Sequence, residues 1–302
     1  MQSFDLALRQ LNGLILGKPV AVRLAVTCLL AGGHLLIEDT PGVGKTTLAH
    51  GLATVMGLDY RRVQFTADLL PADILGSSIF ERETGGFRFQ PGPVFAQLLL
   101  ADEINRASPK VQSALLEAME EHQVTIEGVT RTLPEPFFVI ATQNPAEQLG
   151  TFPLPESQLD RFLMRVSLGY PPREAERALL MGENRRALLA TLLPALDGAS
   201  LRRAQAEAAQ LTVSTALADY VLAVLEASRR SGRFVQGLSP RAGLAIIAAA
   251  RAWAWLEGRD HVLPEDVKAT LPSVIGHRLV PLEPGVTIEE EVARLVMHVA
   301  VP

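Results

Sequence analysis

The chain has 302 residues, of which 48% are hydrophobic and 20% are charged, and its formal net charge is −5 at pH 7. This composition is typical of a globular protein rather than a disordered one, and the length allows one large domain or two ordinary ones. The negative charge excludes a field that would draw the whole molecule to nucleic acid or anionic lipid.

These bounds favour a cytoplasmic protein. The N-terminus has no signal peptide, and no apolar run reaches the ~18 residues that a membrane span needs. Cys28 is the single cysteine, so an intramolecular disulfide is impossible, and we interpret it as a buried structural thiol. The six histidines are scattered, and no Cys/His cluster has the spacing of metal ligands.

The first 33 residues read as two helices. Apolar residues recur at helical spacing from Phe4 to Ile15, and Gly17 and Pro19 mark a turn before a second helix over 20–31. From periodicity alone, these are two packing helices joined by a turn.

A Gly-rich segment at 38–47, Glu-Asp-Thr-Pro-Gly-Val-Gly-Lys-Thr-Thr, lies between an apolar run of buried-strand type at 34–37 and a helical pattern at 48–53. A strand, a Gly-rich turn and a helix opened by Gly-Lys-Thr are typical of a phosphate-binding loop. The glycines let successive main-chain N–H groups turn inward, and the helix N-terminus adds donors and a partial positive charge. The alternative is a Gly-rich turn before a structural helix.

Within this loop, Lys45 is expected to reach the terminal phosphates, and the Thr46 hydroxyl is expected to take one Mg²⁺ position. The strict pattern has glycine where this chain has Asp39, while the remainder of the pattern fits. The residues expected to bind phosphate are Pro41, Gly42, Val43, Gly44, Lys45, Thr46 and Thr47.

A second strand is predicted at 60–65, and a turn into a short helix follows it at 66–74. Alternating residues over 78–89 flank Thr84-Gly85-Gly86, which is typical of a β-hairpin. Such a hairpin either contacts a partner or decorates the surface.

A buried strand over 97–103 ends in two adjacent acids, Asp102 and Glu103. The acids are therefore expected at the carboxyl end of the strand, where open α/β sheets bind ligands. We expect Asp102 to hold the water shell of Mg²⁺ and Glu103 to polarise an attacking water as a general base. Acids often end strands without a catalytic role, but these two follow a phosphate-binding loop.

The α/β pattern continues through the middle of the chain. Residues 109–122 read as an amphipathic helix, 124–131 as a hairpin that turns at Glu127-Gly128, and 137–142 as a third buried strand. Asn144 follows that strand, and it either orients water against the terminal phosphate or is a turn residue before proline.

A last strand at 163–168 follows Arg161, and the predicted domain boundary comes at 171, after which strand signals almost vanish. Arg161 is either a surface ion-pair partner or an arginine finger that acts on a neighbour's nucleotide. Arg241 opens a helix, which is electrostatically unfavourable for a cation unless an anion lies nearby. Helices are predicted at 174–190, 201–210, 213–230, 240–257 and 264–275.

Taken together, these residues resemble the MoxR family of AAA+ ATPases over nearly the whole chain. The Gln-Phe-Thr and Asp-Glu-Ile-Asn-Arg-Ala stretches are specific to this family and its near relatives. Asp39 in place of glycine is familiar within the family, whereas Lys18 departs from the usual glutamine. The matching segments are 38–46, 64–71, 100–107, 141–145, 159–162 and 238–242.

The resemblance implies an α/β protein with an AAA+ αβα core and a five-stranded parallel sheet over 1–171, followed by an all-α lid over 172–302. It further implies a ring, usually of six subunits, with ATP and Mg²⁺ bound between neighbours, and two hairpin inserts that face the ring pore in relatives. The roles that it implies are Walker A for Lys45 and Thr46, Walker B for Asp102 and Glu103, sensor 1 for Asn144, a finger acting in trans for Arg161, sensor 2 for Arg241, and a place beside the base for Gly17.

Members of this family act as chaperone-like ATPases that mature or activate other proteins, often with partners that carry a von Willebrand factor A domain. The resemblance therefore implies that Mg-ATP hydrolysis is coupled to remodelling of a protein client.

Three other classes of nucleotide-binding protein fit parts of this pattern. A nucleic-acid-dependent motor needs cationic loops that track a strand, and neither hairpin turn, at 84–86 or 127–128, carries a cation. A GTP switch would need an Asn/Thr-Lys-x-Asp motif, which the sequence lacks. A nucleotide-gated binding module with negligible turnover stays open.

Overall fold

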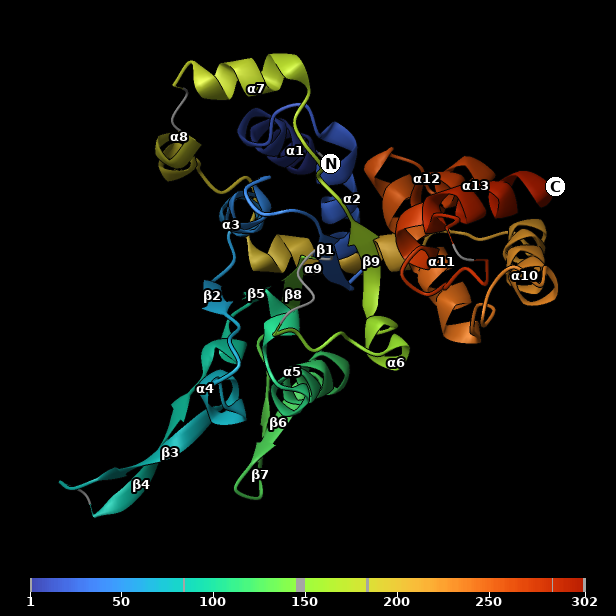
Figure 1. The fold of residues 1–302 in the computed structure, drawn as a ribbon. Coiled ribbons are helices and arrows are strands. Elements are labelled where there is room, and N and C mark those ends of the chain that lie inside the picture. Colours follow the sequence, from blue (N-terminus) through green and yellow to red (C-terminus); the bar gives the residue numbers. More distant parts are fainter. Residues whose placement is uncertain (1, 84, 145–149, 183–184, 284, 301–302) are drawn as a thin grey trace.

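A computed structural model describes residues 2–83, 85–144, 150–182, 185–283 and 285–300 of the chain. A parallel five-stranded sheet lies at the centre of the N-terminal half, in the order β2-β5-β8-β1-β9 (Figure 1). This confirms the predicted fold class. The strands are β1 (His34–Glu38), β2 (Tyr60–Gln64), β5 (Leu98–Asp102), β8 (Phe138–Gln143) and β9 (Phe162–Val166).

The sheet is covered on both faces, which is why its inner strands are continuously apolar. Alternate strand residues enter two separate cores: Leu35 and Ile37 belong to one, and Leu36 belongs to the other. The first core is filled by helices α1 (Gln2–Leu14), α2 (Pro19–Leu30) and α3 (Lys45–Val55), and the second by α5 (Pro109–Glu121).

Both predicted hairpins are present and project from the same end of the molecule (Figure 1). The longer one pairs β3 (Gly76–Glu81) with β4 (Gly86–Pro91), after the short helix α4 (Pro71–Leu75); its turn residue Thr84 lies outside the described residues. The shorter one pairs β6 (Gln123–Ile126) with β7 (Val129–Thr132). Single 3₁₀ turns, η1 (Pro93–Phe95) and η2 (Ile104–Arg106), flank β5.

In the part of the chain described after β9, all regular elements are helices, and two predictions need correction. The helix predicted over 174–190 is two helices, because the chain turns at Met181 and Gly182; residues 183–184 lie outside the described part. A final helix at 288–298 was not predicted. The short α6 (Glu156–Leu159) precedes β9, and the later helices are α7 (Arg173–Leu180), α8 (Arg185–Thr191), α9 (Gly198–Ala209), α10 (Thr215–Arg230), α11 (Pro240–Leu256), α12 (Pro264–Ile275) and α13 (Ile288–His298).

The first part of the helical region packs against the helices that cover the sheet. The main-chain N–H of Ala195 donates to the Val55 carbonyl at 2.8 Å, and Gln205 Nε2 donates to the Leu29 carbonyl at 2.7 Å. Helices α10 to α13 lie together on the right of Figure 1, where α11 packs against α2 and α12 packs against β9, so that they share the first core. The domain boundary at 171 stays a prediction. Among the described helices, none is long and apolar enough to cross a membrane.

Candidate nucleotide site

The Gly-rich segment forms the turn between β1 and α3. Gly42 and Gly44 have φ values of 84° and 101°, in the left-handed region that favours glycine. Helix α3 begins at Lys45, and no side chain caps its first turn. Its first main-chain N–H groups therefore face the loop, as an anion site at a helix N-terminus requires.

A cavity of about 290 Å³ lies against this loop. It gathers residues from the carboxyl ends of three neighbouring strands, because β1 lies beside β8 and β8 beside β5. The structure thus brings together most of the residues predicted from sequence, while Val43 lines an adjoining cavity instead. The lining residues are Pro41, Gly42, Gly44, Lys45, Thr46, Thr47, Asp102, Glu103 and Asn144.

Lys45 is held over the loop by main-chain carbonyls. Its Nζ donates to the carbonyl oxygens of Asp39 and Thr40, at 2.5 Å and 3.2 Å. Lys45 is also one of the residues that line the cavity beside the loop.

The Asp102 carboxylate is held on both oxygens. Thr142 Oγ1 donates to Oδ1 at 2.6 Å, and Arg62 Nη2 donates to Oδ2 at 2.7 Å. The Thr142 hydroxyl also accepts the main-chain N–H of Glu103 at 2.9 Å, so that one side chain on β8 fixes both acids. Arg62 and Thr142 are not among the residues predicted from sequence, because contacts between side chains on neighbouring strands have no signature within either strand.

Glu103 has an uncommon backbone conformation for a residue other than glycine, with φ 56° and ψ 49°. Such conformations concentrate at functional sites, where surrounding structure maintains the strain. The Glu103 carboxylate accepts a hydrogen bond from Arg106 Nη1 at 3.0 Å. Glu103 lines the same cavity as Lys45.

The donor set fits Mg²⁺. The Thr46 hydroxyl and the Asp102 carboxylate line one cavity, and no group of three or more His, Cys, Asp or Glu residues in the described ranges could cage a metal. Mg²⁺ usually keeps several waters and binds through one or two protein oxygens together with substrate phosphates. A site that is completed by phosphate is therefore consistent with these residues.

A second cavity, of about 190 Å³, shares Gly42, Gly44 and Thr47 with the first and is mostly apolar. Ile15 and Leu16, from the turn after α1, lie in its wall. Gly17 does not line it; this residue has φ 69°, and a Cβ there would lie 2.6 Å from Pro172 Cδ. The remaining lining residues are Leu14, Lys18, Val43, Gly169, Pro171 and Leu179.

Arg161 and Arg241 lie elsewhere, and the structure brings them to each other. Both donate to Glu120, from Arg161 Nε at 2.8 Å and Arg241 Nη1 at 3.1 Å. Arg161 directly precedes β9, at the amino edge of the sheet, whereas the loop follows the carboxyl end of β1. Both arginines line a separate cavity of about 320 Å³, on the side away from the chain's own loop.

Glu120 is an ionised anchor for this pair. Desolvation opposes ionisation of its carboxyl, but the charges and hydrogen bonds of Arg161 and Arg241 outweigh that effect and hold the pKa of Glu120 below its ordinary value. Arg241 Nε also lies 3.8 Å from Asp160 Oδ2. The other oxygen of Asp160 accepts a hydrogen bond from Arg278 Nε at 2.6 Å.

A five-stranded parallel sheet with this loop after β1, acids at the end of β5 and a helical region beyond β9 defines an AAA+ protein. Two family descriptions match the chain: "ATPase family associated with various cellular activities (AAA)" at residues 34–164, and "AAA lid domain" at 226–295.

Relatives narrow this class. The chain is 42% identical to YeaC of Bacillus subtilis, over 98% of this chain and 94% of that protein. It is 42% identical to "Chaperone MoxR1" of Mycobacterium tuberculosis, over 100% of this chain and 83% of that protein. A solved structure of a "putative ATPase" from Cytophaga hutchinsonii superposes with a TM-score of 0.90 at 34% identity, covering 100% of this chain and 95% of that one. The chain belongs to the MoxR family of AAA+ ATPases.

Proposed function

We propose that this protein is an Mg-ATPase that couples hydrolysis to the remodelling, maturation or activation of a protein client. One observation carries the hydrolytic part: a single cavity collects Lys45, Thr46, Asp102, Glu103 and Asn144 from separate segments of the chain. This set supplies the parts that phosphoryl transfer to water requires, which are a phosphate clamp, a metal position and a means to orient water.

Each residue has a distinct proposed task. Lys45 and the loop amides bind and neutralise the phosphates, and bound Mg²⁺ supplies additional charge stabilisation. Thr46 and Asp102 hold the metal and its waters. Glu103 accepts a proton from the attacking water, while the Asn144 side chain orients that water.

The arginines are proposed to act on a neighbouring subunit. Arg161 and Arg241 lie together at the opposite edge of the sheet from the chain's own loop, which favours a ring in which this edge meets the next subunit's nucleotide. A hexamer is the expected ring size. Because the Glu120 carboxylate pairs with both arginines, it would hold them side by side against the nucleotide of the next subunit.

The hairpin of β3 and β4 is proposed to contact the client. Phe80 and Phe87 pair across it with ring centroids 5.4 Å apart, and they are 54% and 76% exposed. Flanking charges have both signs, including an ion pair between Arg88 and Glu81. An exposed aromatic pair without excess cations around it suits polypeptide better than a nucleic-acid strand, for which aromatics combine with a positive groove.

The test is a phosphate-release assay followed by capture of the client. Hydrolysis of ATP in preference to GTP, without salt-sensitive stimulation by single-stranded DNA, is the expected result. Glu103→Gln protein held in ATP should then retain a client in a pull-down, and a partner with a von Willebrand factor A domain is one expected component. No phosphate release under any of these conditions would contradict the ATPase proposal, whereas release without a retained client would contradict only the remodelling part.

A further inference from the structure

Asp39 stands where the strict loop pattern has glycine, and its side chain is fully engaged. It is buried, at 7% exposed. Its Oδ2 accepts the main-chain N–H groups of Leu168 and Gly169, both at 2.6 Å, and the Ser167 hydroxyl at 3.0 Å. Its Oδ1 accepts the N–H of Thr40 at 2.9 Å. A glycine at this position would leave two main-chain amides of the 167–169 segment without their acceptor.

The partners of Asp39 form the connection between the sheet and the helical region. Residues 167–169 directly follow β9 and lead to α7. The next residues are fastened to the turn after α1: Lys18 Nζ donates to the Tyr170 carbonyl at 2.6 Å, and Pro172 packs against Gly17. The connection is therefore a fixed strap rather than a loose linker.

The same residue is tied to the phosphate loop through its main chain. Lys45 Nζ donates to the Asp39 carbonyl at 2.5 Å. Asp39 thus joins the ammonium group proposed to clamp phosphate to the strap after β9, through its carbonyl on one side and its carboxylate on the other. Any displacement of the loop that moves Asp39 must move, or break away from, the amides of Leu168 and Gly169.

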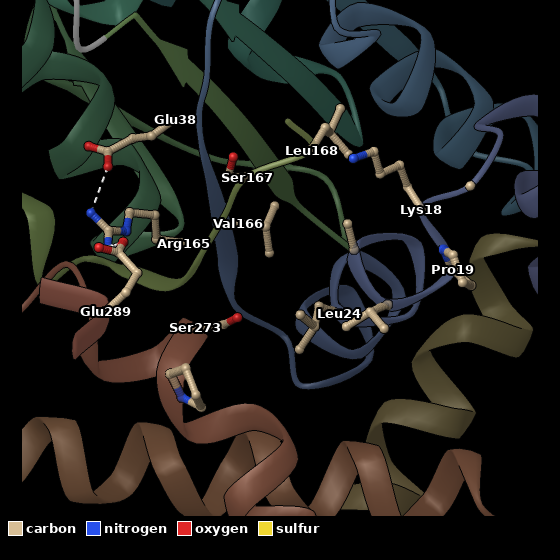
Figure 2. Close-up of a pocket in the computed structure, with 14 residues that line it drawn as sticks. Lys18, Pro19, Leu24, Glu38, Arg165, Val166, Ser167, Leu168, Ser273 and Glu289 are labelled. Atoms are coloured by element: carbon tan, nitrogen blue, oxygen red, sulfur yellow. Dashed lines mark hydrogen bonds and ion pairs between the residues drawn. The ribbon is translucent and has the colours of Figure 1, made fainter. Parts of the chain in front are cut away.

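Glu38, the residue before Asp39, is also connected to the helical region. Arg165, on β9, donates to Glu38 at 2.8 Å and to Glu289 of α13 at 3.3 Å. Figure 2 shows this arginine between the two acids, at the wall of a cavity of about 580 Å³ that Ser273 of α12 also lines. Ser167 lies in the same wall, so the strap borders the space between the core and helices α12 and α13.

We propose that Asp39 is a positioning residue that couples the phosphate loop to the strap at 167–169, so that nucleotide bound at the loop sets the placement of the helical region. The proposal rests on the nucleotide-binding function proposed above. A carboxylate is required because both of its oxygens accept, Oδ2 from three donors and Oδ1 from Thr40, whereas asparagine has one accepting oxygen and its NH2 group would face a donor. Desolvation works against ionisation, but the hydrogen bonds from Gly169, Ser167, Leu168 and Thr40 keep the pKa of Asp39 below its ordinary value, so it stays a carboxylate.

Hydrogen exchange of the full-length protein tests this coupling, because the Leu168 and Gly169 amides are themselves the donors. In the wild type, adding Mg-ADP or Mg-ATP should change the exchange rates of these two amides. In Asp39→Gly, which removes the acceptor, both amides should exchange at least ~10-fold faster, and nucleotide should no longer alter their rates. Ser167→Ala is the matched control, since it removes the hydroxyl donor to Asp39 and leaves the hydrogen bonds from the Leu168 and Gly169 amides in place.

Kinetics separate positioning from nucleotide binding. For Asp39→Asn we expect KM for ATP to stay within ~3-fold of the wild type while kcat falls by at least ~5-fold. If that variant does not fold, Asp39→Glu keeps the charge, displaces the carboxylate by one methylene, and should show the same division between KM and kcat. Wild-type kcat together with an intact nucleotide response at Leu168 and Gly169 would overturn the coupling role. A wild type that binds ADP without hydrolysing ATP would instead overturn the ATPase proposal and leave the exchange test valid.

Discussion

Arg62 and Asp102 are joined across neighbouring strands by two hydrogen bonds to one oxygen, at 3.1 Å from Nε and 2.7 Å from Nη2. The Asp102 side chain is 10% exposed and the Arg62 side chain is 48% exposed. A half-exposed cation therefore shares the carboxylate that is proposed to hold Mg²⁺ waters, and the two cations must compete for it electrostatically.

Removing this competitor should tighten the metal site. In Arg62→Ala, we expect the Mg²⁺ concentration for half-maximal ATPase activity to fall by roughly 3- to 10-fold, because a positive charge near the metal is lost. Arg61→Ala is the matched control on the same exposed strand. A higher Mg²⁺ requirement in Arg62→Ala would show instead that Arg62 orients Asp102 for metal binding.

Mixing two inactive variants tests the proposed action of Arg161 across a subunit boundary. Lys45→Ala lacks the phosphate clamp and Arg161→Ala lacks the finger, so each alone should be inactive. In a random 1:1 mixture, about a quarter of the interfaces would pair an intact loop with an intact finger. ATPase activity should reappear on mixing, and it should not reappear when Lys45→Ala is mixed with Glu103→Gln, since both changes affect the same subunit's site.

The exposed aromatic pair predicts how the protein contacts its client. Phe80→Ser combined with Phe87→Ser should lower the ATPase rate stimulated by an unfolded polypeptide such as casein more than it lowers the unstimulated rate, because exposed apolar contact area is lost from the β3–β4 hairpin. Val129→Ser, on the shorter hairpin and 51% exposed, is the matched control. Equal stimulation of the double variant and the wild type would remove the β3–β4 hairpin from client binding.

Acid should destabilise the fold through His34. Val139 N–H donates to its Nδ1 at 3.0 Å and Nε2 lies 3.2 Å from the Met119 carbonyl, so the proton sits on Nε2 and the ring is neutral. Burial lowers the pKa of His34 to about 4, from 6.5. Between these values the unfolded chain binds more protons, so the unfolding free energy should fall as pH drops from 6.5, by about 3 kcal/mol at pH 4 from this residue.

Denaturant unfolding across that pH window is the measurement. His34→Asn, which keeps an acceptor near the Nδ1 position, should show a shallower loss of stability with acid than the wild type. His298→Asn, a change at an exposed position on α13, should keep the wild-type slope. Identical slopes for all three proteins would exclude His34 as a source of the acid sensitivity.

Local patterns predicted most of the sheet and the loop. The apolar runs before Glu38 and Asp102 predicted two strands, because parallel strands that are buried on both faces are continuously apolar. They also predicted that the functional residues lie at the carboxyl ends of these strands. The helix at 288–298 was missed although its signal is present: Thr287 and Glu290 form a capping box. The break at Met181 and Gly182 was missed because apolar periodicity continues across it.

Contacts between distant segments could not be predicted in this way. Nothing in the segment around Asp39 indicates that its carboxylate binds amides at 168 and 169, and nothing around Glu120 indicates that two arginines from distant segments meet there. Such pairs are set by tertiary packing, which sequence periodicity does not encode. They are also the contacts from which the coupling and trans-acting roles are inferred.

ATP binding and phosphate release, measured side by side for the wild type, Lys45→Ala and Glu103→Gln, test the central claim most directly. We expect Lys45→Ala to lose tight binding, and Glu103→Gln to bind ATP as the wild type does while releasing phosphate at least ~100-fold more slowly, because only the general base is lost. Phosphate release by Glu103→Gln at the wild-type rate would contradict the assignment of this cavity as the site of hydrolysis.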